Sequence, residues 1–224
     1  MADRQTGQDH MEGKEKLAFS AVILNGGQGV RFGGIDKQLL EIDGVPIGFA
    51  LAKTLVQSCE EVLIVGKKNA IYKPLEVQQI EDAVPGLGPA GGLLAGMMKA
   101  RADWIYLCAV DMPFFSYSLS KYMYGRALSK EADIIVCQYK GELQPFFAFY
   151  RKSLAGALAS FVTSGVKPSL RRFISSRSYD LVSLKELQDI GEQEAIFCNI
   201  NNSGSLDAAR QIALEHGLFI DTRL

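Results

Sequence analysis

Apolar runs of strand length alternate with longer, helix-like stretches along most of the chain. The runs are apolar at nearly every position and rich in branched residues, and they cover residues 19–24, 61–65, 104–110 and 133–137. Such runs are typical of central strands in a parallel sheet that is buried on both faces. Helices are predicted between and after them, at residues 46–58, 90–100, 116–130, 152–163 and 204–216. This alternation predicts a doubly wound, Rossmann-like α/β fold with three α/β/α layers.

The apolar segment 144–150 departs from this rhythm. It follows the fourth run closely, whereas a parallel crossover needs about a dozen residues or more. We therefore expect one antiparallel strand in an otherwise mostly parallel sheet. Pro145 predicts a sheet edge or the beginning of a strand, because proline cannot donate to the ladder. Residues 1–16 are expected to form a disordered tail and residues 17–224 a single domain.

The overall composition excludes several classes of protein. The 24 lysines and arginines balance 25 aspartates and glutamates, so net charge gives no sign of a nucleic-acid or membrane partner. The apolar stretches are far shorter than the ~20 residues of a membrane span. The four cysteines form no C-x-x-C motif, which favours reduced thiols in a cytoplasmic protein. The two histidines, His10 and His216, argue against a Ser-His-Asp hydrolase or a multi-histidine metal site.

The segment 24–37, L-N-G-G-Q-G-V-R-F-G-G-I-D-K, carries the strongest local signal of a binding site. It contains five glycines and two cations, Arg31 and Lys37, and it follows the first predicted strand. Glycine-rich backbone at the end of a strand lets N–H groups approach an anion, so the segment predicts a phosphate cradle. Phe32 and Ile35 stand where a dinucleotide fingerprint and a P-loop need glycine and lysine. The alternative is a glycine-rich surface turn.

Asp111 directly follows the buried run 104–110. A carboxylate at the C-terminal end of a central strand faces the ligand crevice of an open α/β sheet. Mg²⁺ prefers one or two such carboxylates together with phosphate oxygens. Asp111 is therefore the candidate metal ligand, and the alternative is an aspartate that caps a turn.

The segment 24–37 resembles the signature of the molybdenum cofactor guanylyltransferases, L-A-G-G-x-S-x-R-M-G-x-D-K. The wider relatives of that family are nucleotidyltransferases that build nucleotide sugars and cytidylylated intermediates. The residues that match in order, allowing one extra residue before the aspartate, are Gly26, Gly27, Arg31, Gly33, Asp36 and Lys37. The residues that depart from the pattern are Asn25 for alanine, Gly29 for serine and Phe32 for methionine.

Four more segments extend the resemblance over residues 19–212. The segments 80–82 and 88–92 resemble the family's acidic residue and its G-P-L-A-G turn into a helix, although a plain helix N-terminus is the alternative. The third, 108–114, puts the family's magnesium ligand at Asp111.

The ending 199–206 resembles the family's N-x-N-T-P-E-(E/D)-L. One interpretation is that its asparagine amides bind phosphate or support the metal. The alternative is that Ser203 or Ser205 simply caps the last helix. The basic segment 167–172 resembles one on the acceptor side, but a solvated helix face is the simpler interpretation.

The resemblance implies transfer of GMP from GTP to the phosphate of molybdopterin, with release of pyrophosphate. The implied catalytic residues are Lys37, Arg31 and Asp111, with Asp111 holding Mg²⁺ as the cofactor. The implied nucleotide-binding residues are Leu24, Asn25, Gly26, Gly27, Lys37, Asp82 and Asp111. Asn199 and Asn201 are implied on the acceptor side. The implied partners are GTP, a molybdopterin-type acceptor and, transiently, molybdoenzymes, with no nucleic acid and no membrane.

The choice of base and the class of activity both have alternatives. Cytidylyltransferase relatives usually have alanine where this chain has Gly26, and a glycine leaves more room for a purine, which favours guanine. Val65-Gly66 stands where the family usually has asparagine, so one expected polar contact is missing. One alternative is a cytidylyltransferase of the same cofactor or a sugar-phosphate nucleotidyltransferase. The other is a nucleotide-binding module without turnover.

Overall fold

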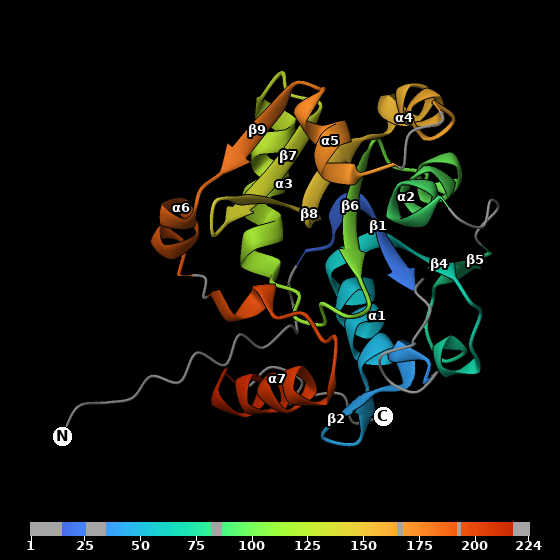
Figure 1. Cartoon of the computed structure of the whole chain (residues 1–224), viewed down its shortest axis with the longest axis vertical. Coiled ribbons are helices and arrows are strands. Elements are labelled where there is room, and N and C mark those ends of the chain that lie inside the picture. Colours follow the sequence, from blue (N-terminus) through green and yellow to red (C-terminus); the bar gives the residue numbers. More distant parts are fainter. Residues whose placement is uncertain (1–14, 26–34, 82–86, 165–167, 192–193, 217–224) are drawn as a thin grey trace.

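The computed structural model describes residues 15–25, 35–81, 87–164, 168–191 and 194–216. These residues form a sheet of seven strands in the order β5-β4-β1-β6-β8-β7-β9, with helices on both faces (Figure 1). The strands of this sheet are β1 (Leu17–Asn25), β4 (Cys59–Gly66), β5 (Gln78–Ile80), β6 (Trp104–Ala109), β7 (Ile134–Tyr139), β8 (Glu142–Arg151) and β9 (Tyr179–Val182). A separate hairpin consists of β2 (Glu41–Ile42) and β3 (Val45–Pro46). The three-layer α/β/α prediction is confirmed.

The helices fall into two layers, one on each face of the sheet. The helices are α1 (Ile47–Ser58), α2 (Gly88–Lys99), α3 (Tyr117–Ser129), α4 (Ala155–Val162), α5 (Leu170–Ser175), α6 (Leu184–Asp189) and α7 (Ser203–His216). The shorter 3₁₀ turns are η2 (Lys37–Leu39), η3 (Ala70–Tyr72), η4 (Lys152–Leu154) and η5 (Glu194–Phe197). Apolar residues of α1, α3, α6 and α7 share one core, and those of α2, α4 and α5 share the other. Among the described residues, no helix is both long and apolar enough to cross a bilayer.

Strand β1 shows why the predicted strands are apolar at consecutive positions. Its side chains alternate between the two cores: Ala21 and Ile23 pack with α1, while Val22 and Leu24 pack with α2. All four residues are buried. A strand with helices on both faces needs apolar residues on both sides, so its sequence is a continuous run of apolar residues.

Strand β8 confirms the expected antiparallel strand and corrects one detail. It pairs antiparallel with both β6 and β7 and therefore lies inside the sheet, so the edge expected from Pro145 is wrong. The register shifts within this pair: Val136 faces Ala148, but the next residue of β7, Cys137, faces Gln144. The bulge removes ladder positions around residue 145, and a proline that cannot donate is tolerated there.

The five predicted helices are present at nearly the expected positions, whereas short elements were missed. Helices α5 and α6 and strand β9 are each four to six residues long, which is too short for a clear periodic pattern. Helix α5 covers the second half of the basic segment 167–172. Arg171 and Arg172 are exposed while Leu170 and Phe173 are buried, which agrees with a solvated helix face over an apolar one.

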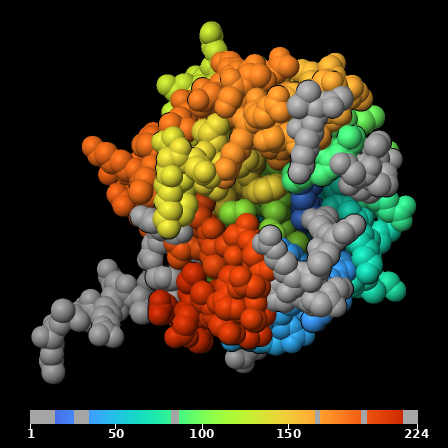
Figure 2. Space-filling model, in the orientation of Figure 1, coloured from blue at the N-terminus to red at the C-terminus, as the bar shows by residue number. Residues whose placement is uncertain are grey.

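The carboxyl ends of the parallel strands meet at one edge of the sheet. Asn25 at the end of β1 pairs with Gly66 of β4, and the backbone N–H of Val110, just past β6, donates to the carbonyl of Leu24. The chain leaves β1 toward β4 on one side and reaches β6 on the other, which makes this edge a topological switch point. In the space-filling view, blue atoms of β1 and green atoms of the β6 region lie in a hollow above α7 (Figure 2).

Candidate active site

Three residues from distant parts of the sequence meet at this edge. The ammonium of Lys37 donates to Asp111 Oδ2 at 2.8 Å and to Asn201 Oδ1 at 3.1 Å. The side chains of Lys37 and Asp111 are 20% and 24% exposed, so the pair is accessible from solvent without being fully solvated. The structure thus brings together one residue from each of three sequence segments that predicted the site. We call Lys37, Asp111 and Asn201 the edge cluster.

Lys37 opens the 3₁₀ turn η2. Asp36 precedes it as the N-cap, and the Asp36 side chain accepts the backbone N–H of Gln38 at 3.3 Å. A short turn capped by its own aspartate holds the backbone at Lys37 in one conformation. The lysine side chain then extends to the end of β6.

Asp111 lies two residues beyond the end of β6. Its backbone carbonyl accepts the N–H of Ile200 at 2.8 Å, so the segment that leads to α7 is fixed beside it. The helix that follows, α3, is capped by Ser116, which accepts the N–H of Leu119 at 3.0 Å. In the described residues the Asp111 carboxylate contacts Lys37 and caps no turn.

Asn201 reaches Lys37 because a neighbour caps α7. The side chain of Asn202 accepts the N–H of Ser205 at 2.9 Å, and Ser205 Oγ accepts the N–H of Asn202 at 3.0 Å. Asn202 is therefore the cap, in place of the expected Ser203 or Ser205, and Ser205 completes a reciprocal capping box. Asn199 is exposed, and among the described residues it makes no contact with the edge cluster.

Leu24 and Asn25 end β1 beside this cluster. Leu24 packs against the first turns of α2, where a Cβ on Gly92 would lie only 2.9 Å from its Cδ2. Helix α2 begins without a side-chain cap and with proline in its first turn, so its N-terminal N–H groups keep their capacity to bind an anion. Asn25 is buried and its side-chain amide donates to Gln38 Oε1 and to the carbonyl of Lys67.

Four predicted site residues, Gly26, Gly27, Arg31 and Asp82, lie outside the residues that the structure describes. Within the described residues, no group of three or more histidine, cysteine, aspartate or glutamate side chains is placed to hold a metal. At the edge, the Asp111 carboxylate and the Asn201 amide oxygen both accept from the Lys37 ammonium. Oxygen donors of this kind suit a hard cation that takes its remaining ligands from phosphates and water.

Sequence reasoning missed Gln38 and Lys67 as part of this region. Gln38 is fully buried, and Lys67 contributes its backbone carbonyl as well as its ammonium. A glutamine in a turn gives no sign of burial in the sequence. The one available signal was its position directly after Lys37.

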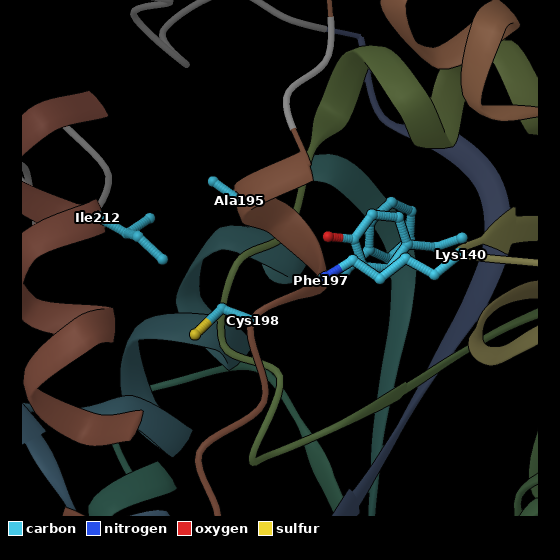
Figure 3. A pocket seen from close by; sticks show the side chains of 6 residues that line it. Lys140, Ala195, Phe197, Cys198 and Ile212 are labelled. Carbon is cyan, nitrogen blue, oxygen red and sulfur yellow. The ribbon is translucent and has the colours of Figure 1, made fainter. Parts of the chain in front are cut away.

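An apolar pocket of about 360 Å³ lies along the segment that leads to Asn201 (Figure 3). It is lined by Tyr139, Lys140, Ala195, Phe197, Cys198 and Ile212. The Tyr139 and Phe197 rings stack at 4.7 Å, and the Lys140 ammonium lies 5.0 Å from the Tyr139 ring centroid. Lys140 is the charged member of the lining, so the pocket lacks the paired charges and amides of the edge cluster.

Comparisons with known proteins show which family the chain belongs to. The model of the MobA-like NTP transferase domain matches residues 21–181. The molybdenum cofactor guanylyltransferase of Burkholderia cenocepacia is 31% identical over 159 residues, which cover 66% of this chain and 78% of that protein. The molybdenum cofactor guanylyltransferase of Syntrophotalea carbinolica is 27% identical over 192 residues, covering 86% and 90%.

A comparison with solved structures supports the fold. The crystal structure of molybdopterin-guanine dinucleotide biosynthesis protein A from Archaeoglobus fulgidus superposes with a TM-score of 0.75 at 20% identity, covering 88% of this chain and 99% of that one. The region that the family model matches contains residues 21–25 of β1, together with Lys37 and Asp111. The chain therefore belongs to the MobA-like NTP transferase family and, within it, to the molybdenum cofactor guanylyltransferases, and it is a nucleotidyltransferase.

Proposed function

We propose that the chain transfers GMP from GTP to the phosphate of molybdopterin. An oxygen of the acceptor phosphate attacks the α-phosphorus of GTP, the bond from that phosphorus to the β-phosphate oxygen breaks, and pyrophosphate leaves with the electron pair. The acceptor phosphate already carries negative charge, so the step needs no strong base. Positioning and charge neutralisation are the main tasks left to the protein.

The observation that carries the proposal is the edge cluster at the switch point of the sheet. There the Lys37 ammonium donates to the Asp111 carboxylate at 2.8 Å and to the Asn201 amide oxygen at 3.1 Å. A triphosphate with a divalent cation needs this combination of charges. Lys37, together with Arg31, would stabilise the charge that grows on the leaving pyrophosphate.

The remaining nucleotide contacts are proposed from the resemblance. Backbone N–H groups from Asn25 to Gly27 would cradle the phosphates at the end of β1, beside Leu24. Asp82 would contact the nucleotide. On the acceptor side we favour Asn201 over Asn199, because Asn201 faces Lys37 while Asn199 is exposed and makes no contact with the cluster among the described residues.

Mg²⁺ is proposed as the cofactor, and the donor set at the edge fits it. Asp111 would hold the cation together with phosphate oxygens, and the Asn201 amide oxygen lies close enough to the same point to assist. The bound cation supplies Lewis-acid neutralisation of the triphosphate. In the described structure Asp111 is engaged by Lys37, so a triphosphate that draws Lys37 away leaves the carboxylate available to the cation. We therefore expect the cation and the triphosphate to bind more tightly together than separately.

We also propose a cytoplasmic location and transient contact with molybdoenzymes that receive the product. The location is supported by the four cysteines, all of which are free thiols, three of them buried. The contact with molybdoenzymes rests on the family resemblance.

The test is release of pyrophosphate from GTP, CTP and UTP, each with Mg²⁺, with and without a molybdopterin acceptor. Acceptor-dependent release from GTP, well above that from CTP and UTP, is the expected result. Preferred use of CTP would identify a cytidylyltransferase of the same cofactor. Binding of triphosphate without release under any condition would instead support a nucleotide-binding module.

A further inference from the structure

A closed ring of polar groups, buried at Asn25 and Gln38 and exposed at the Lys67 ammonium, lies beside the turn that carries Lys37. The amide of Asn25 donates to Gln38 Oε1 at 2.6 Å, and Gln38 Nε2 donates to Asp36 Oδ2 at 2.7 Å. Asp36 Oδ2 lies 3.6 Å from the Lys67 ammonium, and the Lys67 carbonyl accepts the second N–H of Asn25 at 2.9 Å. The ring thus joins the end of β1, both neighbours of Lys37 and the residue that follows β4. We call Asn25, Asp36, Gln38 and Lys67 the amide ring.

The centre of this ring is held by packing as well as by hydrogen bonds. Gln38 is fully buried and Asn25 is 6% exposed. A Cβ on Gly48 would lie 2.9 Å from Gln38 Cβ and 2.5 Å from Tyr72 Oη, so the start of α1 presses directly on the glutamine. Burial, together with the charge of Asp36, raises the pKa of Tyr72, which keeps its hydroxyl neutral beside the ring. Gln38 therefore has little freedom to leave its position.

Asn25 stands where the family pattern has alanine, and its partner across the sheet explains the exchange. Asn25 pairs in the β1–β4 ladder with Gly66, which belongs to the Val65-Gly66 pair that stands where the family usually has asparagine. Gly66 has φ of 134°, a region that residues with a side chain rarely adopt. An asparagine at 66 would be strained, so this chain supplies the amide from the facing strand.

We propose that Asn25 and Gln38 are positioning residues that hold the Lys37 ammonium where the leaving pyrophosphate develops charge. This role rests on the proposed function, because it acts through Lys37. Lys37 lies between Asp36 and Gln38 in the sequence, and the side chains of both neighbours are held by the ring. A displacement of about 1 Å at a reacting group can reduce a rate a hundredfold, so loss of the ring should lower kcat while the fold persists.

The experiment compares Asn25→Ala and Gln38→Met in two backgrounds, the wild type and Lys37→Ala. In the wild type each substitution should lower kcat about tenfold to a hundredfold, with a smaller change in KM for GTP. In the Lys37→Ala background neither should lower kcat further, because the group that they position is gone. Effects of equal size in both backgrounds, or a kcat within twofold of the wild type, would refute the role.

A matched control separates positioning from general loss of stability. Ser20 is also buried on β1, and its hydroxyl donates to Glu61 at 2.5 Å at the opposite end of the strand. Ser20→Ala should lower the Tm while leaving kcat unchanged. A kcat loss in Ser20→Ala as large as in Asn25→Ala, at the same loss of Tm, would show that the ring is only structural. Should Asn25→Ala or Gln38→Met fail to fold, Asp36→Asn removes one ring charge from a part-exposed position and is expected to follow the same pattern with a smaller effect.

A binding measurement keeps the positioning role testable apart from the transferase activity. Inorganic pyrophosphate, followed by calorimetry, should bind more weakly to Asn25→Ala and to Gln38→Met than to the wild type. Neither substitution should weaken binding further once Lys37 is alanine. If the wild type released no pyrophosphate from any triphosphate, the proposed function would fail, and this measurement would still decide whether the ring acts through Lys37. Equal pyrophosphate affinity in the wild type, in Asn25→Ala and in Gln38→Met would refute the positioning role.

Discussion

Two ion clusters in this molecule use the same kinds of side chain but differ in how fully their hydrogen-bonding positions are occupied. In the first, Arg126 of α3 donates Nε and Nη2 to the two oxygens of Asp180 on β9, at 2.7 and 2.6 Å, and Nη1 to Glu186 of α6. Glu186 also accepts from the Tyr122 hydroxyl and from the backbone and hydroxyl of Ser183. We call this set the α3–α6 cluster.

The edge cluster is built more sparsely. Among the described residues the Asp111 carboxylate has one side-chain partner, Lys37, although a carboxylate offers about four acceptor positions. The ammonium of Lys37 has two partners there and rotates freely about its stem. Such a cluster can exchange its partners for a phosphate and a cation at little cost.

The difference separates an ion cluster with a structural role from one that we propose binds a ligand. Bidentate arginine contacts and a capping box fix the α3–α6 cluster between three elements. At the edge, a lysine on a turn is joined by single contacts to a carboxylate beyond a strand end and to an uncharged amide before a helix. The first arrangement should contribute stability and the second should contribute turnover, which mutation of each can test.

The largest expected effect is on turnover, from Asp111→Asn. Asparagine keeps the shape and still accepts from Lys37, but it loses the charge that a divalent cation needs. Metal neutralisation is worth several kcal/mol in the transition state, so turnover should fall by on the order of 10³. Steady-state pyrophosphate release at low Mg²⁺ measures this, with circular dichroism to check the fold.

Asp180→Asn is the matched control, because it removes a carboxylate from the α3–α6 cluster. It should lower the Tm and leave turnover per folded molecule unchanged. Wild-type turnover in Asp111→Asn at low Mg²⁺ would remove this carboxylate from the mechanism and erase the contrast between the two clusters.

Lys37→Ala should produce the next largest effect. Loss of one electrostatic donor to a developing charge typically costs about 10²–10³ in rate, and the effect should fall on kcat more than on KM for GTP. Lys152→Ala provides the comparison, since that part-exposed ammonium donates to the carbonyl of Ala100, a backbone contact. A raised KM with an unchanged kcat would mean that Lys37 contributes only to binding of the ground state.

The sequence was sufficient to predict the architecture and to name all three residues of the edge cluster as candidates. Continuous apolar runs identified the buried strands, and the position of Asp111 and Lys37 after two of those runs placed them at the carboxyl edge. Asn201 was predicted only with a capping alternative, because serine and asparagine at a helix start serve either purpose. The structure assigns the cap to Asn202.

Two features of the fold could not be predicted, because they depend on contacts between segments that are distant in the sequence. Gln38 is polar, lies in a turn and is nevertheless fully buried, because Tyr72 and the start of α1 close over it. Pro145 is accommodated by a register shift between β7 and β8, which the sequence of β8 alone does not show. Both features follow from packing between segments that are distant in the chain.

Arg126→Ala should change stability by about 1–3 kcal/mol and leave turnover per folded molecule unchanged. The substitution leaves two part-buried carboxylates without their cation, which costs more than a surface pair and less than a fully buried one. The side chain of Arg126 is 17% exposed. Urea unfolding gives the free energy of unfolding, and Arg210→Ala, whose partner Asp207 is 70% exposed, should change it by less than ~0.5 kcal/mol. Equal effects of the two substitutions would show that the α3–α6 cluster is an ordinary surface contact.

The smallest expected effect is on the free energy of unfolding at acid pH, and it tests the contribution of the Glu186 carboxylate. Burial alone would raise its pKa, but hydrogen bonds from Ser183 and Tyr122 and the charge of Arg126 outweigh burial and lower the pKa from 4.5 to about 2. Because the folded pKa is depressed, the ionised carboxylate stabilises the protein above about pH 4.5, and this contribution is lost as the pH falls toward 2. The side chain is 34% exposed, so the contribution at neutral pH is discounted to roughly 1 kcal/mol. Glu186→Gln lacks the titration, and the difference in unfolding free energy between wild type and variant should therefore shrink between pH 5 and pH 2. A difference that stays constant over that range would show that Glu186 acts through packing and its cap alone. The stability of the α3–α6 cluster would then come from the bidentate contact between Arg126 and Asp180.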